Sequence, residues 1–294
     1  MRFGVLLPPE FGHSDDPEWV TTFAQCAEEL GFDELSVVEH SVVVRDTAST
    51  YPYSPDGRSP LPDDCPLPDP LELLAFVAAR TVRLGLATGV LVLPNHHPVV
   101  LAKRLATLDR LSGGRLRVCL GVGWMREEIE ACGGDFDRRG PLADEAIAAM
   151  RTLWADRGAA GADFAGPTYP FRGAHSWPKP ERPAGVPLYI GGHSRAAARR
   201  AGRIGDGFQP LGLAGADLDA ALALMRSTAV EAGRDPASVD LVLGATLGRV
   251  DAERVEQAAA LGASRLLLSP SRGATDLDAL VEQMAGAAAR LGLS

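Results

Sequence analysis

The clearest structural signal in the chain is the stretch Tyr189–Arg195, which reads YIGGHSR. An apolar run that ends in Gly191 and Gly192 is typical of a strand followed by a tight turn, and Ser194 is a residue type that often caps the next helix. Unpaired backbone N–H groups and the dipole at the start of a helix attract anions. The stretch therefore predicts a strand–turn–helix unit, which is either a phosphate site or an ordinary capped helix with nothing bound.

The same alternation of strand and helix extends outward from this unit to both ends of the chain. Apolar runs typical of strands that are covered on both faces occupy residues 2–7, 34–38, 83–93, 116–121, 187–190, 207–210, 239–243 and 265–268. Segments with the helical spacing of apolar residues occupy 17–30, 70–81, 99–111, 142–155, 194–204, 218–232, 252–261 and 277–291. About eight such steps predict an α/β fold, a (β/α)8 TIM barrel that forms one domain over residues 1–294. A doubly wound open sheet is the alternative, but it usually carries a glycine-rich fingerprint after the first strand, where Gly4 stands alone.

Composition limits the partners that we expect. The 294 residues carry a formal net charge of −9 without a basic run, which argues against nucleic acid and anionic membrane surfaces as partners. The N-terminal sequence does not resemble a secretory leader, and no apolar run reaches transmembrane length. Four cysteines without a CxxC pair are typical of reduced thiols. We therefore expect a cytoplasmic protein that acts on a small molecule.

Two long segments interrupt the alternation. Residues 41–68 are rich in proline and acidic residues, and residues 156–186 include a stretch at 164–171 that could form a small hairpin. Long loops in a compact domain are usually functional or mobile. We expect both segments to shape the substrate pocket, and 41–68 to act as a lid.

Catalytic groups in barrel enzymes stand on the loops that follow the strands. The second strand ends in Glu39 and His40, a pair that can perform proton chemistry near neutral pH, although a structural histidine is the alternative. Gly89 in the third strand indicates a bulge or the close approach of a ligand, or else a packing glycine. His96 and His97 are adjacent, and neighbouring side chains in an extended segment point in opposite directions. Since no further ligand cluster accompanies them, we predict no metal site.

The fourth strand runs into glycines. Gly121 and Gly123 would allow a flat ring to lie close to the backbone, with Trp124 as a wall. The alternative is a strand-to-helix turn in which Glu127 and Glu128 stabilise the N-terminus of a helix.

Several of these segments together resemble the luciferase-like monooxygenase superfamily. They are HPVVLAK at 97–103, ATLDRLSGGR at 106–115, GVGW at 121–124, EH at 39–40, GG at 191–192 and GDGF at 205–208. The resemblance covers nearly the whole chain and weakens after about residue 212. The sequence WMREE at 124–128, together with the scarcity of lysine, resembles the branch that uses coenzyme F420, a 5-deazaflavin.

The resemblance implies a barrel, often dimeric, that holds a flavin or coenzyme F420 over the C-terminal ends of its strands. The cofactor phosphate would meet the turn at 191–194, and a non-prolyl cis peptide at 89–90 would back its ring. His40 matches a family active-site histidine. The catalytic residues implied are His40 and Glu39. The cofactor-binding residues implied are Leu7, Thr88, Gly89, Val90, Asn95, Gly121, Gly123, Trp124, Gly191, Gly192, His193 and Ser194.

One departure concerns the branch that oxidises sugar phosphates. An acidic residue follows the fourth-strand glycines in that branch, whereas Arg126 is the nearest match here, with Glu127 beside it. The last third of the chain also lacks a cluster of lysines for a substrate phosphate. Both features argue against sugar-phosphate oxidation.

Three functions are consistent with the sequence. The first is an oxidoreductase, expected to be a homodimer, that transfers hydride between coenzyme F420 and a small organic substrate. The second is a monooxygenase that uses reduced FMN and dioxygen. The third is a flavin-binding barrel without catalytic activity.

Overall fold

Eight parallel strands close into a barrel within the part of the chain that the structure describes. The structure is a computed structural model, and it describes residues 1–9, 13–45, 47–271, 274 and 276–293. The strand order around the barrel is β1-β10-β9-β8-β7-β4-β3-β2. The barrel strands are β1 (Arg2–Leu6), β2 (Glu34–Val37), β3 (Gly85–Val92), β4 (Leu116–Gly121), β7 (Leu188–Gly191), β8 (Gly207–Gln209), β9 (Asp240–Thr246) and β10 (Arg265–Ser269). The predicted TIM barrel is confirmed.

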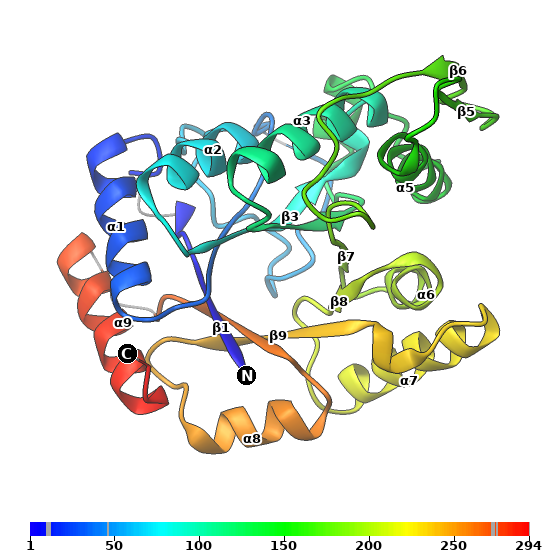
Figure 1. Ribbon diagram of the computed structural model, residues 1–294. Helices are drawn as coiled ribbons and strands as arrows, with labels where there is room; N and C mark the ends of the chain where they lie inside the picture. The colour runs from blue at the N-terminus through cyan, green and yellow to red at the C-terminus, as the bar shows by residue number, and fades with distance from the viewer. Residues whose placement is uncertain (10–12, 46, 272–273, 275, 294) are drawn as a thin grey trace.

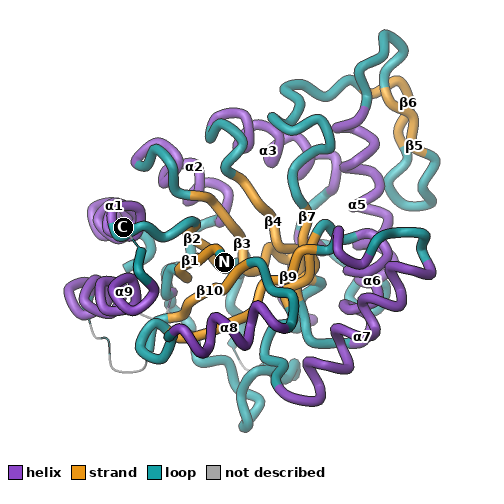
Figure 2. Tube along the Cα trace, turned by 60° about the horizontal axis from the view of Figure 1, so that its bottom comes forward, coloured by secondary structure: helices purple, strands orange, loops and turns teal. Residues whose placement is uncertain are grey.

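Helices surround the strands, as Figure 1 and Figure 2 show. They are α1 (Pro17–Glu29), α2 (Pro70–Arg80), α3 (Pro98–Leu111), α4 (Arg126–Ala131), α5 (Arg139–Ala155), α6 (Arg195–Ile204), α7 (Gly215–Glu231), α8 (Ala252–Ala260) and α9 (Leu277–Leu291), with 3₁₀ turns η2 (Leu93–Asn95) and η3 (Pro236–Ser238). The main apolar core lies between these helices and the outer surface of the barrel.

Local sequence explains where several helices begin. Asp16 caps α1 by accepting hydrogen bonds from the N–H groups of Glu18 and Trp19 at 2.9 and 3.2 Å, and Ser194 caps α6 in the predicted way. The sequence analysis placed the start of α5 at Leu142, whereas the helix begins at Arg139. Proline is accepted in a first helical turn because its missing N–H has no partner there, so Pro141 does not delay this start.

A buried ionic cluster fills the N-terminal end of the barrel. Glu34 at the start of β2 pairs with Arg117 of β4, whose Nε lies 3.1 Å from the Glu34 Oε2, and with Arg265 of β10 at 3.3 Å. The Arg117 guanidinium also stacks on the ring of Tyr189, 4.7 Å from its centroid. Because this end is filled, an internal site must open at the opposite, C-terminal end of the strands.

The third strand has an irregular register. Its pairing with β4 shifts between Gly89 and Leu91, and the Gly89–Val90 peptide is cis, as the family resemblance implied. The second insertion contains the antiparallel pair β5 (Ala162–Phe164) and β6 (Phe171–Ala174), which confirms the hairpin suggested at 164–171. This hairpin lies at the periphery beside α5 (Figure 1).

Candidate functional site

A cavity of about 370 Å³ opens at the C-terminal ends of β2, β3, β4 and β7. Residues 50–53, from the loop after β2, form part of its wall. The complete lining is Val38, Glu39, His40, Thr50, Tyr51, Pro52, Tyr53, Gly89, Val90, Val92, Gly121, Val122, Gly123, Trp124, Glu128, Arg139, Gly191, Gly192, His193, Ser194, Ala197 and Leu211. We call it the main cavity. It occupies the end of the barrel where enzymes of this fold place their chemistry.

Val90 and two glycines form an apolar part of the lining. A Cβ atom on Gly121 would lie 2.6 Å from Val90 Cγ2, and a Cβ on Gly191 would overlap Val90 Cγ1 and lie 3.0 Å from Cys119 Sγ. The Val90 side chain therefore occupies the space that side chains at 121 and 191 would need. Only glycine at these two positions leaves that surface flat, which suits a planar ring.

His40 is held by a buried carboxylate from α4. Its Nδ1 lies 2.8 Å from Oε2 of Glu128, a residue that is 2% exposed. The other Glu128 oxygen accepts the backbone N–H of Ser41 at 2.6 Å and the amide N–H of Asn95 at 3.2 Å. An ionised carboxylate only accepts hydrogen bonds, so Nδ1 is the donor in the His40–Glu128 pair. His40 Nε2, which makes no hydrogen bond to a described residue, is left to exchange a proton in the cavity.

Glu39 belongs to a second imidazole–carboxylate pair. One of its oxygens lies 2.6 Å from His96 Nε2, and the other accepts the backbone N–H of Val92. Both oxygens of this buried side chain are therefore engaged in fixing the turn after β3. The geometry gives Glu39 a positioning role, and its predicted direct part in catalysis stays a prediction.

The turn after β7 presents unpaired N–H groups beside the cavity. The Gly192 N–H donates to the Gln209 carbonyl at 3.1 Å, so it is already engaged. The backbone N–H groups of His193, Ser194 and Arg195 make no hydrogen bond to the described part of the chain. The Ser194 hydroxyl oxygen accepts the Ala197 N–H at 3.1 Å. These donors stand at the start of α6, where the helix dipole favours an anion.

Arg139 adds a cation on the same side. It opens α5, and the carbonyl of the next residue, Gly140, accepts a hydrogen bond from Arg200 of α6 at 3.0 Å. One Arg139 nitrogen donates to the Phe136 carbonyl at 2.6 Å, and its Nε is buried without a partner among the described residues. Burial and the nearby Arg126 lower the pKa of Arg139. The ordinary pKa of a guanidinium is so high that the group still stays charged. The lining of the cavity thus includes a positive group as well as the turn that carries the backbone donors.

Three predicted cofactor-binding residues do not line the main cavity. Leu7 is buried in the core. The Thr88 hydroxyl bonds both the carbonyl and the N–H of Cys119 at 2.9 and 3.0 Å, because this side chain points to the neighbouring strand. Asn95 reaches Glu128 instead. The structure brings together the other predicted residues, which are Gly89, Val90, Gly121, Gly123, Trp124, Gly191, Gly192, His193 and Ser194, with Glu39 and His40.

Several residues of the site were not predicted from the sequence. Glu128 was considered only as a helix-terminus charge, although the residue holds His40. Arg139, Tyr51 and Tyr53 also line the cavity without having been singled out. Their positions depend on how the loop after β2 and the start of α5 fold over the strand ends, which spacing along the chain does not reveal.

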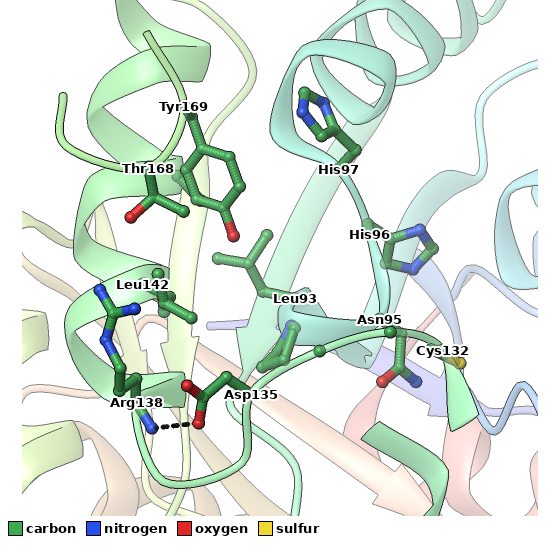
Figure 3. Close-up of a pocket in the computed structure, with 15 residues that line it drawn as sticks. Leu93, Asn95, His96, His97, Cys132, Asp135, Arg138, Leu142, Thr168 and Tyr169 are labelled. Carbon is green, nitrogen blue, oxygen red and sulfur yellow. Dashed lines mark hydrogen bonds between the residues drawn. The ribbon is translucent and has the colours of Figure 1, made fainter. Parts of the chain in front are cut away.

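A second cavity of about 340 Å³ lies on the other side of the turn after β3 (Figure 3). His97 and Tyr169 meet there edge to face, with ring centroids 5.5 Å apart, and the Arg138 N–H donates to Asp135 Oδ1 at 3.1 Å. Asn95 and His96 line this cavity, while their side chains bond Glu128 and Glu39 of the main cavity. The turn between the two cavities therefore holds both carboxylates of the main one, which is the better candidate for catalysis.

The described residues contain no group of three or more histidine, cysteine, aspartate or glutamate side chains placed to hold a metal ion. None of their helices has the length and apolar character needed to cross a membrane.

The geometry defines an α/β barrel with an imidazole–carboxylate pair and a turn with unpaired backbone N–H groups at one mouth. The family model described as luciferase-like monooxygenase matches residues 1–290, and the chain belongs to that family. An uncharacterized protein of Mycobacterium tuberculosis (strain ATCC 25618 / H37Rv) is 32% identical over 291 residues, which cover 97% of this chain and 98% of the relative. The F420-dependent glucose-6-phosphate dehydrogenase of Nocardia farcinica is 33% identical over 236 residues, 77% of this chain and 63% of that protein. The crystal structure of monooxygenase RslO1 from Streptomyces bottropensis superposes with a TM-score of 0.75 at 23% identity, covering 99% and 98% of the two chains.

Proposed function

We propose that this protein is an oxidoreductase that binds coenzyme F420 in the main cavity and transfers hydride between it and a small organic substrate. One observation carries the proposal. A single cavity joins an anion-binding turn and Arg139 to the His40–Glu128 pair, with the flat surface of Val90, Gly121 and Gly191 as part of the same lining. The relative named for F420-dependent activity supports the choice of cofactor.

The residues present fit the proposed cofactor. Its phosphate needs several donors and a cation, and the turn at 193–195 and Arg139 Nε have unpaired N–H groups. Its flat ring needs a surface without side-chain protrusions, which Gly121 and Gly191 leave open around Val90. When bound, coenzyme F420 would supply the hydride chemistry.

The protein would supply proton transfer and positioning. His40 Nε2 accepts the proton of a substrate hydroxyl or returns it to a carbonyl oxygen. Glu128 keeps the Nδ1 proton in place, so that Nε2 is the nitrogen presented to the substrate. Glu39, through Val92 and His96, fixes the turn that also carries Asn95. We propose that residues 50–53, within the predicted lid, exclude water from the reacting atoms.

An FMN-dependent monooxygenase is the second candidate. The family description favours it, because it names monooxygenases, and the same turn would bind the phosphate of FMN. The two candidates differ in the cofactor that the cavity prefers.

A spectroscopic titration of the purified protein with coenzyme F420, FMN and riboflavin tests the proposal. We expect saturable binding of F420, seen as a change in its absorbance and fluorescence, and weaker binding of FMN. Binding of FMN but not of F420 would establish the second candidate in place of the first. Absence of binding by all three ligands would reject both.

A further inference from the structure

We infer that the substrate of the main cavity is an uncharged molecule with a flat aromatic or conjugated ring and an oxygen atom that hydrogen-bonds to His40 Nε2. The inference rests on the proposed function, because it assumes that this cavity is the active site. It names the substrate class, which the proposed hydride transfer leaves open.

A row of aromatic rings lines the cavity from the proton site to the anion-binding turn. Trp124 meets His40 and Tyr51 edge to face, with ring centroids 6.1 and 5.2 Å apart. Tyr51 meets Tyr53 at 5.4 Å, and Tyr53 meets His193 at 5.3 Å, again with nearly perpendicular planes. All five side chains line the main cavity. Such rings favour another flat, unsaturated ring, because pairs of aromatic rings gain from stacked or edge-to-face contacts in addition to the surface that they bury.

The buried carboxylates around His40 disfavour an anionic substrate at this end of the cavity. Glu128 contacts the His40 ring, and Glu39 precedes His40 in the chain. Both carboxylates are buried, where the lower dielectric strengthens charge interactions. Each of them already has hydrogen-bond donors, so neither offers a salt bridge to a cationic substrate at low cost. A phosphate or carboxylate on the substrate would meet repulsion at this end of the cavity.

No lysine is available to neutralise such an anion. The chain has only Lys103 and Lys179. Lys179 donates to the Leu153 carbonyl at 2.6 Å, and Lys103 donates to the Trp177 carbonyl, both outside the main cavity. Arg139 lies on the side of the cavity next to α6, where we propose that it binds the cofactor phosphate.

The Tyr53 ring in this wall is uncharged near neutral pH. Burial raises the pKa of Tyr53 to about 12, so its hydroxyl stays protonated. Its oxygen lies 3.4 Å from His193 Nδ1. The row therefore offers ring faces together with polar hydroxyl and ring-nitrogen groups, which matches a neutral ring with an oxygen substituent.

The test compares two probes that differ in ring saturation. Acetophenone and cyclohexyl methyl ketone carry the same acetyl group on an aromatic and a saturated ring, and glucose 6-phosphate serves as the anionic probe. Binding is measured by ligand-observed NMR and calorimetry on the full-length protein, with and without bound cofactor. We expect acetophenone to bind about 3- to 10-fold more tightly than the saturated ketone, and glucose 6-phosphate not to compete. Equal or reversed affinities, or competition by glucose 6-phosphate, would overturn the inference.

Variants of the tyrosines test which residues cause the preference for acetophenone over the saturated ketone. Tyr51→Leu and Tyr53→Leu should remove most of this preference, whereas Tyr51→Phe should keep it because the ring remains. Tyr169→Leu alters a tyrosine of the second cavity and should leave the ratio unchanged. Retention of the full preference in both leucine variants would contradict the assignment, provided that their circular dichroism shows a folded barrel. A cofactor titration on the same samples separates the proposed function from the substrate inference. Cofactor binding without a preference for the aromatic ketone would contradict only the inferred substrate class.

Discussion

Replacement of Gly121 by alanine tests the packing that keeps the cavity surface flat. The added Cβ would lie 2.6 Å from Val90 Cγ2 and 3.3 Å from Val90 Cβ, while an ordinary carbon–carbon contact is about 3.5–4.0 Å. Gly121 has no left-handed backbone conformation, so the cost is steric and not one of strain. About 1 Å must be recovered by movement of Val90 or of β4. Overpacking of this kind costs about 1–3 kcal/mol of unfolding free energy.

Val90→Ala provides the partner of a double-mutant cycle. The three atoms nearest to the added methyl group all belong to Val90, and alanine there removes both Cγ atoms. The double variant should therefore be less destabilised than the sum of the single variants, with a coupling energy of about 1–2 kcal/mol. Gly121→Ala alone should also weaken cofactor binding, because the displaced Val90 side chain protrudes into the cavity.

Urea unfolding followed by circular dichroism measures these free energies. Gly244→Ala is the matched control, since Gly244 lies in β9 and a Cβ there meets no atom within 4 Å. If Gly121→Ala is as mild as Gly244→Ala, or if Val90→Ala does not reduce its cost, the reasoning about the glycines is wrong.

Three further predictions concern the site and the barrel. In Glu128→Gln the amide oxygen keeps the bonds from Ser41 and Asn95, so an NH2 donor faces His40 Nδ1 in place of an acceptor. ¹⁵N NMR of the imidazole should then show a shift toward the Nε2-protonated form, and turnover should fall by about 10²–10⁴-fold; an unchanged tautomer would refute the positioning role. Ser194→Ala should lower the unfolding free energy by about 1 kcal/mol through loss of the helix cap and should weaken FMN binding more than riboflavin binding, whereas equal weakening would place the phosphate elsewhere. Burial alone would raise the pKa of Glu34, but the charge of Arg117 outweighs burial, and the pKa lies below its usual value. The ionised carboxylate therefore stabilises the fold above the unfolded-state pKa of about 4.3. This contribution is lost as the pH falls through the lower pKa of the folded state. Glu34→Gln should therefore cost about 3–5 kcal/mol at pH 7, because it leaves Arg117 buried and uncompensated, and the gap to the wild type measured by urea unfolding should narrow at acid pH; a constant gap would contradict the assignment.

The fold was predictable because each strand and helix carries its own local signal. Apolar runs such as Leu266–Leu268 and capped helices such as the one after Ser194 are visible without any tertiary contact. The register shift at Gly89 was suggested by a glycine inside a buried strand. The short helix α4 was predicted only as an alternative, through the charges of Glu127 and Glu128 in its first turn, because six residues leave too little periodicity to recognise.

The site was predictable only in part, because side-chain direction decides which strand-end residues share a cavity. Gly121 and Gly191 are the last residues of β4 and β7, and His40 comes shortly after the end of β2, so their place at the mouth of the barrel is implied by topology. Thr88 stands one residue before Gly89, yet its hydroxyl bonds β4 instead of facing the cavity. Glu128 reaches His40 across 88 positions of sequence. No pattern along the chain encodes a contact of that separation.

A crystal structure of the protein with coenzyme F420 tests the central claim most directly. We predict the cofactor phosphate within hydrogen-bond distance of the Ser194 and Arg195 N–H groups and of Arg139, with the tricyclic ring against Val90 and its reactive face toward His40. A cofactor found in the second cavity beside Tyr169, or with its phosphate away from the start of α6, would contradict the account.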